Sequence, residues 1–326
     1  MTAITLIQAV NQAMAYALEN DPNTVIFGED VGSNGGVFRA TDGLQDRFGA
    51  KRVVDTPLAE SMIAGMAIGM STYGLKPIAE FQFMGFIYPA FNQIISHAAR
   101  MRNRTRSRLN CPIVFRAPYG GFIHAPEHHS ESTEALFAHT SGLRVVIPST
   151  PARAYGLFLA ALRDPDPVIF LEPKRIYRAV KQDVPDNGEA LPLDTAFLVR
   201  EGKDITLISW GASMQETGQA ADALSKEGIE ADVIDLASIS PIDMDTILRS
   251  VEKTGRCVIV HEAANECGVG ANIAARLAEE GLFHLRAPVV RVTGYDTHMP
   301  YLTLEKKYMP SVQRIVTQAK TLMEFS

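Results

Sequence analysis

The strongest candidate for acid–base chemistry is Glu60, which stands where a short strand passes into an apolar helix. Residues 52–55 are rich in β-branched side chains, and Pro57 is tolerated at the first position of a helix. In one interpretation Thr56 caps the helix and Glu60 only favours the helix dipole. In the other Glu60 turns inward, because a capping box would need its acid at position 59. The residue types leave both interpretations open.

A second candidate site is the loop of residues 119–132, which carries three of the eight histidines, His124, His128 and His129. Loops hold functional side chains more often than regular elements do, so we expect at least one of these imidazoles to take part in function. A zinc site is disfavoured because no cysteine accompanies the histidines and their spacing does not place them on one helical face. Pro126 also interrupts the segment.

The composition is that of an acidic globular protein. A length of 326 residues is enough for two domains, and the 46% of hydrophobic and 21% of charged residues are near globular averages. The formal net charge of −6 gives no electrostatic case for nucleic acid, so the arginines between residues 100 and 108 are expected to be a solvated helix end. The longest apolar run, residues 62–70, is too short to span a bilayer, and the start lacks a signal-peptide pattern, so a cytoplasmic protein is expected. Three widely spaced cysteines indicate no disulfide framework.

Strand and helix patterns alternate along the chain, which predicts an α/β fold with mainly parallel sheets. A stretch rich in Pro, Asp and Gly between the two halves predicts a linker, so domains are expected at residues 1–180 and 195–326, with the linker at 181–194. Gly268 and Gly270 lack the third glycine of a dinucleotide fingerprint and are expected to serve close packing. Strands are expected at 24–28, 52–55, 77–83, 111–116, 144–148, 167–173, 204–210, 231–236 and 257–261, and helices at 5–19, 87–102, 152–162, 213–226 and 271–280.

Six segments carry a family resemblance: residues 28–31, 52–60, 79–83, 129–132, 168–174 and 291–297. Taken together, they resemble the beta subunit of the thiamine-diphosphate-dependent 2-oxoacid dehydrogenases, the decarboxylating components of pyruvate and branched-chain 2-oxoacid dehydrogenase complexes. The resemblance implies a pyrimidine-binding domain and a transketolase C-terminal-type domain within an α2β2 heterotetramer. The Gly-Asp-Gly and downstream Asn that hold diphosphate and Mg²⁺ in such enzymes are missing here, so an alpha subunit must supply them.

The resemblance also implies roles for single residues. Glu60 is the carboxylate that faces a ring nitrogen of the cofactor's aminopyrimidine and shares a proton with it. Leu58, Gln82 and Phe86 match positions that line the cofactor, and Phe86 stands where many relatives carry tyrosine, so an aromatic wall is kept but a hydroxyl is lost. His129 matches a histidine that assists proton transfer when the acyl group passes to the lipoyl arm. The alternative for His129 is a hydrogen bond within its own loop.

Relatives in this family also carry a structural monovalent cation. Its mostly carbonyl ligands match Ile113, Ala161, Leu162, Asp164 and Asp166, and hard oxygen donors suit such an ion. The alternative is that the two aspartates only form turns in a proline-rich segment. Both interpretations stay open.

The activity implied is oxidative decarboxylation of a 2-oxoacid, pyruvate or branched-chain, on thiamine diphosphate with Mg²⁺. The acyl group would then pass to a lipoyl group on a separate dihydrolipoamide acyltransferase core. One alternative is the beta subunit of an acetoin dehydrogenase. The other is a non-catalytic dinucleotide-binding or scaffold protein, which would bind its ligand without an alpha partner. No nucleic acid or membrane partner is expected.

Overall fold

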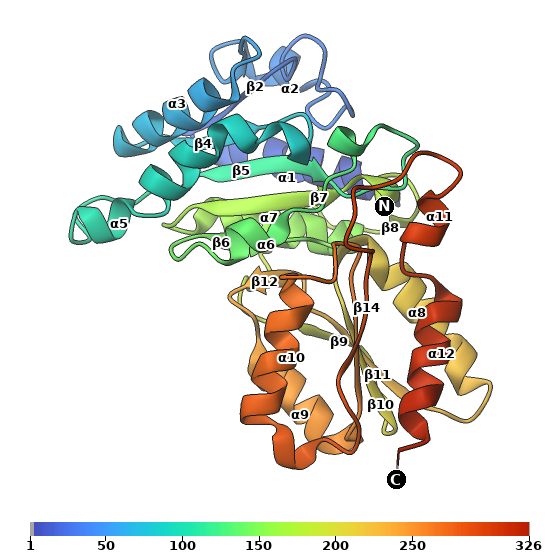
Figure 1. Ribbon diagram of the computed structural model, residues 1–326. Coiled ribbons are helices and arrows are strands. Elements are labelled where there is room, and N and C mark those ends of the chain that lie inside the picture. The colour runs from blue at the N-terminus through green and yellow to red at the C-terminus, as the bar shows by residue number, and fades with distance from the viewer. Residues whose placement is uncertain (1–2, 326) are drawn as a thin grey trace. The chain divides into compact units, whose positions relative to one another are not determined.

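The computed structural model describes residues 3–325, which form two compact units that are not continuous along the chain (Figure 1). Within the described residues, the first unit comprises 3–119 and 136–193, and the second comprises 120–135 and 194–325. Each unit has helices packed on a mainly parallel sheet, so the predicted α/β fold is confirmed. Residues 181–193 stay with the first unit, whereas the histidine-bearing loop belongs to the second.

The sheet of the first unit runs in the order β6-β7-β5-β4-β2-β3, and all of these neighbours are parallel. Its central strands are buried along their whole length, which is why they read as continuous apolar runs in the sequence. The strands expected in the first half are all present, with ends shifted by a few residues. They are β2 (Thr24–Gly28), β3 (Val53–Asp55), β4 (Lys76–Glu80), β5 (Val114–Tyr119), β6 (Arg144–Val146) and β7 (Val168–Pro173).

The helices of the first unit differ from the prediction mainly in one place. The opening helix α1 (Leu6–Asn20) begins with a capping box formed by Thr5 and Gln8, and it packs against α7 (Pro151–Arg163). The continuous helix expected at 87–102 is wrong, because the segment is broken into 3-10, α and π turns. The pieces are η2 (Tyr88–Ala90), α4 (Phe91–Gln93), η3 (Ile94–Ala98) and α5 (Met101–Arg104), and η1 (Met84–Phe86) precedes them.

The remaining elements described here are three helices and a short antiparallel pair of strands. They are α2 (Leu44–Phe48), α3 (Glu60–Thr72), α6 (Glu134–Ala138), β1 (Ile4–Thr5) and β8 (Lys181–Gln182).

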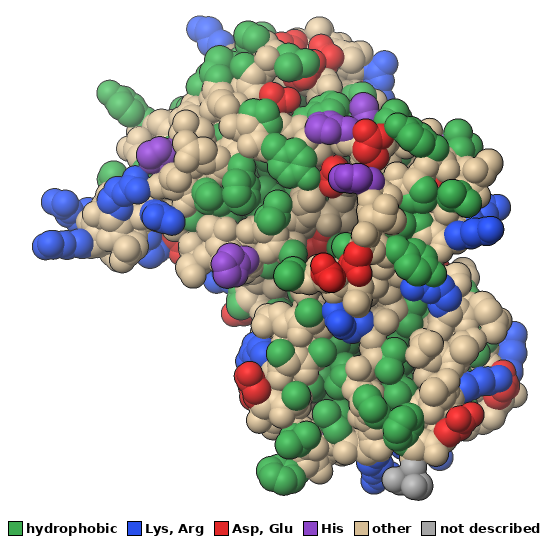
Figure 2. Space-filling view, viewed as in Figure 1, with side chains coloured by type: hydrophobic (Ala, Val, Ile, Leu, Met, Phe, Trp, Pro, Cys, Tyr) green, Lys and Arg blue, Asp and Glu red, His purple; other side chains and the backbone are tan. Residues whose placement is uncertain are grey.

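Basic side chains gather around α5. The helix is labelled in Figure 1, and Figure 2 shows the Lys and Arg side chains in the same place on the surface. Arg100, Arg104, Arg106 and Arg108 are exposed, as predicted for a solvated basic helix end, whereas Arg102 is half-buried and pairs with Asp166. Across residues 3–325, no helix has the length and apolar character needed to cross a bilayer.

The sheet of the second unit runs in the order β14-β13-β10-β11-β9. The strand β10 is parallel to both of its neighbours, and only the edge strand β9 is antiparallel. Six elements of this unit were not predicted from the sequence: β9, β12, β14, α9, α11 and α12. The elements are β9 (Phe197–Arg200), β10 (Ile205–Ser209), β11 (Ala231–Asp235), β12 (Ser238–Ser240), β13 (Cys257–Val260), β14 (Val290–Val292), α8 (Met214–Ser225), α9 (Met244–Thr254), α10 (Val269–Glu280), α11 (Glu305–Tyr308) and α12 (Val312–Met323).

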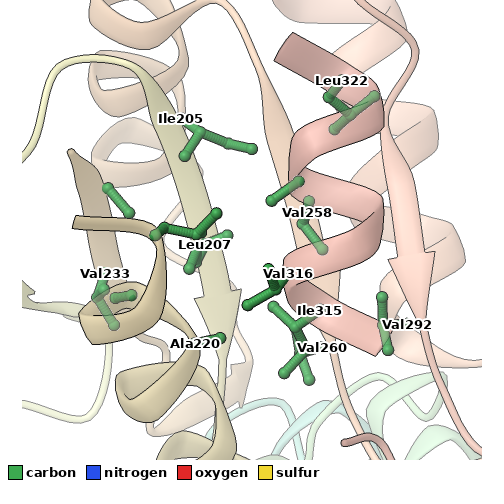
Figure 3. Close-up of a cluster of buried hydrophobic side chains, with 14 of the residues drawn as sticks. Ile205, Leu207, Ala220, Val233, Val258, Val260, Val292, Ile315, Val316 and Leu322 are labelled. Atoms are coloured by element: carbon green, nitrogen blue, oxygen red, sulfur yellow. The ribbon is translucent and has the colours of Figure 1, made fainter. Parts of the chain in front are cut away.

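The core of the second unit lies between its sheet and the pair α8 and α12 (Figure 3). Leu207 of β10 and Val258 of β13 face Ile315 and Leu322 of α12, and all four side chains are buried. Because α12 has its apolar residues on one face, burying that face fixes it against the sheet.

The predicted close packing at the start of α10 is confirmed. A Cβ at Gly270 would lie 2.6 Å from Nε2 of His261, which is fully buried. Gly268 and Gly270 therefore leave room for the imidazole ring of His261, which is the close packing expected of them.

Candidate active site

Glu60 is the first residue of α3, and it is not part of a cap. Ala59 occupies the N-cap position without a side-chain hydrogen bond, and the Thr56 hydroxyl donates to the carbonyl of Pro57 at 3.1 Å. The interpretation in which Thr56 caps the helix and Pro57 is its first residue is therefore wrong, because the helix starts three residues after Pro57. Glu60 is half-buried. The carboxylate of Glu60 therefore lies in the first turn of α3 without serving as a helix cap.

Glu60 follows β3 at the place where the order of the strands in the sheet reverses. The strand β2 pairs with β3 on one side and with β4 on the other, and ligands of open α/β sheets bind outside the carboxyl ends of strands at such a switch point. Glu29 and Asp30 directly follow β2, and Gln82 follows β4. Gln82 Nε2 lies 3.5 Å from Asp30 Oδ2. Polar side chains from three strands therefore meet at this edge.

Glu29 is a site residue that the sequence analysis quoted only within a motif and gave no role. Burial raises the pKa of Glu29, and the negative charges of Asp30 and Glu60 raise it further. This coupling places Glu29 close to Glu60. The signal that could have found it is its position immediately after a buried strand.

Aromatic and apolar side chains complete the same edge. The rings of Phe83 and Phe86 meet edge to face with 5.3 Å between centroids, and Phe38 meets Phe83 at 5.4 Å. The Ser61 hydroxyl donates to the carbonyl of Pro89 at 2.6 Å and ties the start of α3 to η2. Leu58 is 68% exposed although it is a large apolar residue. The structure thus brings Glu60, Gln82, Phe86 and Leu58 to one edge of the first unit.

A buried charged network, which the sequence analysis missed, lies at the ends of β4, β5 and β7. Arg116 donates from Nε and Nη2 to the two carboxylate oxygens of Glu172 at 2.6 and 2.7 Å, and from Nη1 to Glu80. The Tyr177 hydroxyl also donates to Glu172, at 2.7 Å. Each of these four side chains is at most 2% exposed. The network therefore ties the end of β4, one of the strands that carry the site, to β5 and β7.

The histidine-bearing loop belongs to the second unit and contains the 3-10 turn η4 (Glu127–His129). His129 is half-buried, whereas His128 and His124 are exposed. Nδ1 of His124 lies 2.8 Å from Oε2 of the fully buried Glu305. Within residues 3–325, no group of three or more His, Cys, Asp or Glu side chains has the arrangement of a metal site.

The residues matched to a cation site meet at the opposite end of the sheet of the first unit. The amide of Val168 donates to the carbonyl of Ile113 at 2.9 Å, and Asp164 ends α7, whose last turn contains Ala161 and Leu162. Both aspartates are paired with arginine at 2.7 Å, Asp164 with Arg144 and Asp166 with Arg102. A carbonyl oxygen has two lone pairs, so those of Ile113 and Ala161 can accept one hydrogen bond and still face an ion.

Two domain families match the chain: "Transketolase, pyrimidine binding domain" over residues 2–180 and "Transketolase, C-terminal domain" over residues 194–315. The pyruvate dehydrogenase E1 component subunit beta of Acholeplasma laidlawii is 50% identical over 322 residues, which cover 99% of this chain and 98% of the relative. The same subunit of Bacillus subtilis (strain 168) is 46% identical over 325 residues, which cover 100% of both. The chain belongs to the beta-subunit family of the thiamine-diphosphate-dependent 2-oxoacid dehydrogenases.

This beta subunit has the fold of transketolases. A split-gene transketolase, described as an inactive beta4 tetramer, matches with a TM-score of 0.82 at 24% identity and covers 99% of both chains. The transketolase of Leishmania mexicana matches with a TM-score of 0.72 at 17% identity, covering 99% of this chain and 46% of the transketolase. At these identities the likeness concerns the fold alone. It confirms the prediction of two transketolase-type domains in the beta subunit.

Proposed function

We propose that this beta subunit works in a pyruvate dehydrogenase E1 component, which decarboxylates pyruvate and passes the acyl group to a lipoyl group. The observation that carries the proposal is the full-length identity of 50% and 46% to two subunits of that name. The subunit would assemble with an alpha subunit as α2β2 and dock with a lipoyl-bearing dihydrolipoamide acyltransferase core. Pyruvate is favoured over branched-chain acids and acetoin because these relatives are named for pyruvate.

The residues at the carboxyl ends of β2, β3 and β4 fit the aminopyrimidine half of thiamine diphosphate. Glu60 offers a carboxylate to a ring nitrogen and Gln82 an amide, while Phe86 and the exposed Leu58 offer apolar surface for a flat ring. The sequence has no Gly-Asp-Gly segment for a diphosphate. The proposal therefore gives the pyrimidine to this chain, and the diphosphate and Mg²⁺ to the alpha subunit.

Glu60 has the central role in this arrangement. When bound, thiamine diphosphate supplies the nucleophilic carbon for a 2-oxoacid. The carboxylate of Glu60 holds and returns a proton at the pyrimidine nitrogen, which is general acid–base work by a positioned side chain. Glu29 and Asp30 add negative charge at the same edge, and a nearby negative charge favours a protonated ring.

The division of the cofactor between two chains is tested by calorimetric titration of thiamine diphosphate. We expect feeble binding to the beta subunit alone and binding tighter by about 100-fold, or about 2.8 kcal/mol, after mixing with the alpha subunit. Thiamine without phosphates is the matched control and should gain little from mixing. Equal affinity of thiamine diphosphate for the isolated chain and the mixture would favour a self-sufficient binding protein instead.

His129 is proposed to assist proton transfer during acyl transfer to the lipoyl group. In His129→Asn we expect transfer to a free lipoyl domain to fall by about 10²- to 10⁴-fold, the usual contribution of a general acid or base. Decarboxylation measured with an artificial electron acceptor should survive. The control is His128→Asn, an exposed neighbour in the same turn, which should change neither rate. An equal loss of both activities, or of neither, would contradict the role.

We further propose a K⁺ ion between the last turn of α7 and Ile113, the residue that precedes β5. The two aspartates there are already balanced by arginines, so the site suits a monovalent ion held mainly by neutral carbonyls of Ile113, Ala161 and Leu162. Exchanging KCl for choline chloride at equal ionic strength should lower the unfolding midpoint by about 2–4 °C for each kcal/mol of binding energy. The same midpoint in both salts would contradict a bound ion, and NaCl serves as a size control.

A further inference from the structure

The loop that carries His129 is closed at its base by one buried carboxylate. Oε1 of Glu262 accepts the backbone N–H of Gly121 at 3.2 Å and the hydroxyl of Ser132 at 2.8 Å. The amide of Gly120 donates to the carbonyl of Glu131 at 3.0 Å. Glu262 is 4% exposed. Two positions eleven residues apart in the loop are therefore held by the same oxygen atom.

The backbone of the loop approaches this carboxylate as closely as glycine allows. Gly120 has a φ of +86°, and a Cβ at this position would overlap Oε1 of Glu262. Any larger residue would combine backbone strain with a steric clash, so it would push the loop off the carboxylate. Glycine at position 120 is thus a requirement of the contact with Glu262.

Glu262 occupies the place in its sheet where a ligand is expected. It lies two residues after β13. The strand order reverses at β10, because β11 lies on one side of β10 and β13 on the other, which makes the edge between β10 and β13 the switch point of the second unit. The rings of Trp210 and His261 stack there with 5.0 Å between centroids, and burial lowers the pKa of His261 to about 3, so its ring is neutral. In this unit the chain's own loop binds at the switch point through Glu262.

The tip of the loop is held by two further contacts to the segment after β14. The Tyr301 hydroxyl donates to Oε2 of Glu127 at 2.8 Å, and His124 pairs with Glu305. These tip contacts involve exposed partners, whereas the contacts to Glu262 are shielded from solvent, so they are the stronger restraint.

We propose that Glu262 is a positioning residue for His129, acting by fixing both ends of the loop on which His129 lies. This inference rests on the proposed function, since it takes the acyl-transfer role of His129 as given. A carboxylate that accepts two hydrogen bonds in a buried setting holds them firmly, and its removal leaves the Gly121 N–H and the Ser132 hydroxyl without an acceptor. His129 would then sample many positions, and small misplacements of a catalytic group are costly in rate.

The test compares Glu262→Leu with Glu262→Gln in the reconstituted heterotetramer. Leucine removes the acceptor, whereas glutamine keeps an oxygen in the same place. For Glu262→Leu we expect faster hydrogen exchange in residues 120–132, and a fall in the kcat for acyl transfer to a free lipoyl domain of about 10- to 100-fold. The KM for the 2-oxoacid and the decarboxylation rate with an artificial acceptor should stay within about twofold of wild type. Glu262→Gln should restore most of the exchange protection and the rate.

Glu266→Gln, an exposed acid on the same segment, is the control and should behave as wild type. Unchanged exchange in Glu262→Leu would overturn the proposal, and so would an equal fall of both activities with a general loss of protection across the second unit. Absence of acyl transfer by the wild-type heterotetramer would overturn the proposed function but not the loop restraint, because the exchange measurement reports on that restraint by itself.

Discussion

Replacing Glu60 by glutamine should reduce decarboxylation by the reconstituted heterotetramer to well below about a tenth of the wild-type rate, because a positioned acid–base group typically contributes about 10²- to 10⁴-fold. Glutamine keeps the size and the polar surface of the side chain but cannot release or take up a proton. The fold should persist because Glu60 makes no cap, and an acid in the first helical turn is worth only about 0.3–1 kcal/mol. Decarboxylation with an artificial acceptor and the thermal unfolding midpoint are the two measurements.

The matched control for Glu60→Gln is Asp46→Asn. Asp46 is also an acid in the first turn of a helix, α2, but its side chain is exposed and it is none of the residues proposed to line the cofactor. It should lose the same small dipole contribution and no activity. An activity of Glu60→Gln above a tenth of wild type would contradict the proton-transfer role, whatever the change in stability.

Replacing Arg116 by leucine should destabilise the first unit by about 3–5 kcal/mol, because it leaves two buried carboxylates without their common cation. Arg116 binds Glu172 with a two-pronged geometry and Glu80 with its remaining nitrogen. Burial and the charge of Glu172 raise the pKa of Tyr177 far above its usual value, so Tyr177 stays a neutral donor and supplies no positive charge. Denaturant unfolding of the heterotetramer, followed by a probe in the first unit, measures the loss.

Two comparisons separate the buried network from ordinary surface pairing. The triple variant Arg116→Met, Glu80→Gln, Glu172→Gln removes all three charges together and should recover much of the stability. Arg276→Leu breaks the exposed pair with Glu280 on α10 and should cost about 0.5 kcal/mol or less. A loss below about 1 kcal/mol in Arg116→Leu would show that its carboxylate partners find other donors or water.

Much of the fold follows from local patterns in the sequence. The buried strand β2 has the bounds that its apolar run predicts, and the helix expected at 5–19 is α1, which begins and ends one residue later. The start of α3 was mispredicted because Pro57 and Thr56 look like helix-start residues, whereas the Thr56 hydroxyl bonds to the next carbonyl. The broken helix after residue 87 carries one local signal, Pro89, because proline cannot continue a helix begun before it. The π turn at Ile94–Ala98 contains no proline or glycine, so no such signal marks it.

The candidate site shows where sequence reasoning stops. The switch-point residue Glu60 could be named from its strand and helix, and the family resemblance supplied its role. Arg116 and Glu172 are 56 residues apart, and only the parallel register of the strands brings them together. A charged residue inside an apolar strand is the sole trace that such a network leaves in the sequence. The anchoring of the loop by Glu262 spans 141 residues and leaves no trace in its vicinity.

That span has a consequence for how the protein is made. During translation the segment after β5 leaves the ribosome 141 residues before its anchor, Glu262. At about 5–20 residues per second, it waits roughly 7–28 s before the partner emerges. During that delay the loop lacks its contact with Glu262. A chain truncated after residue 180, where the first family match ends, would lack Glu262 altogether. We expect proteases to cut such a chain at the loop of residues 119–132.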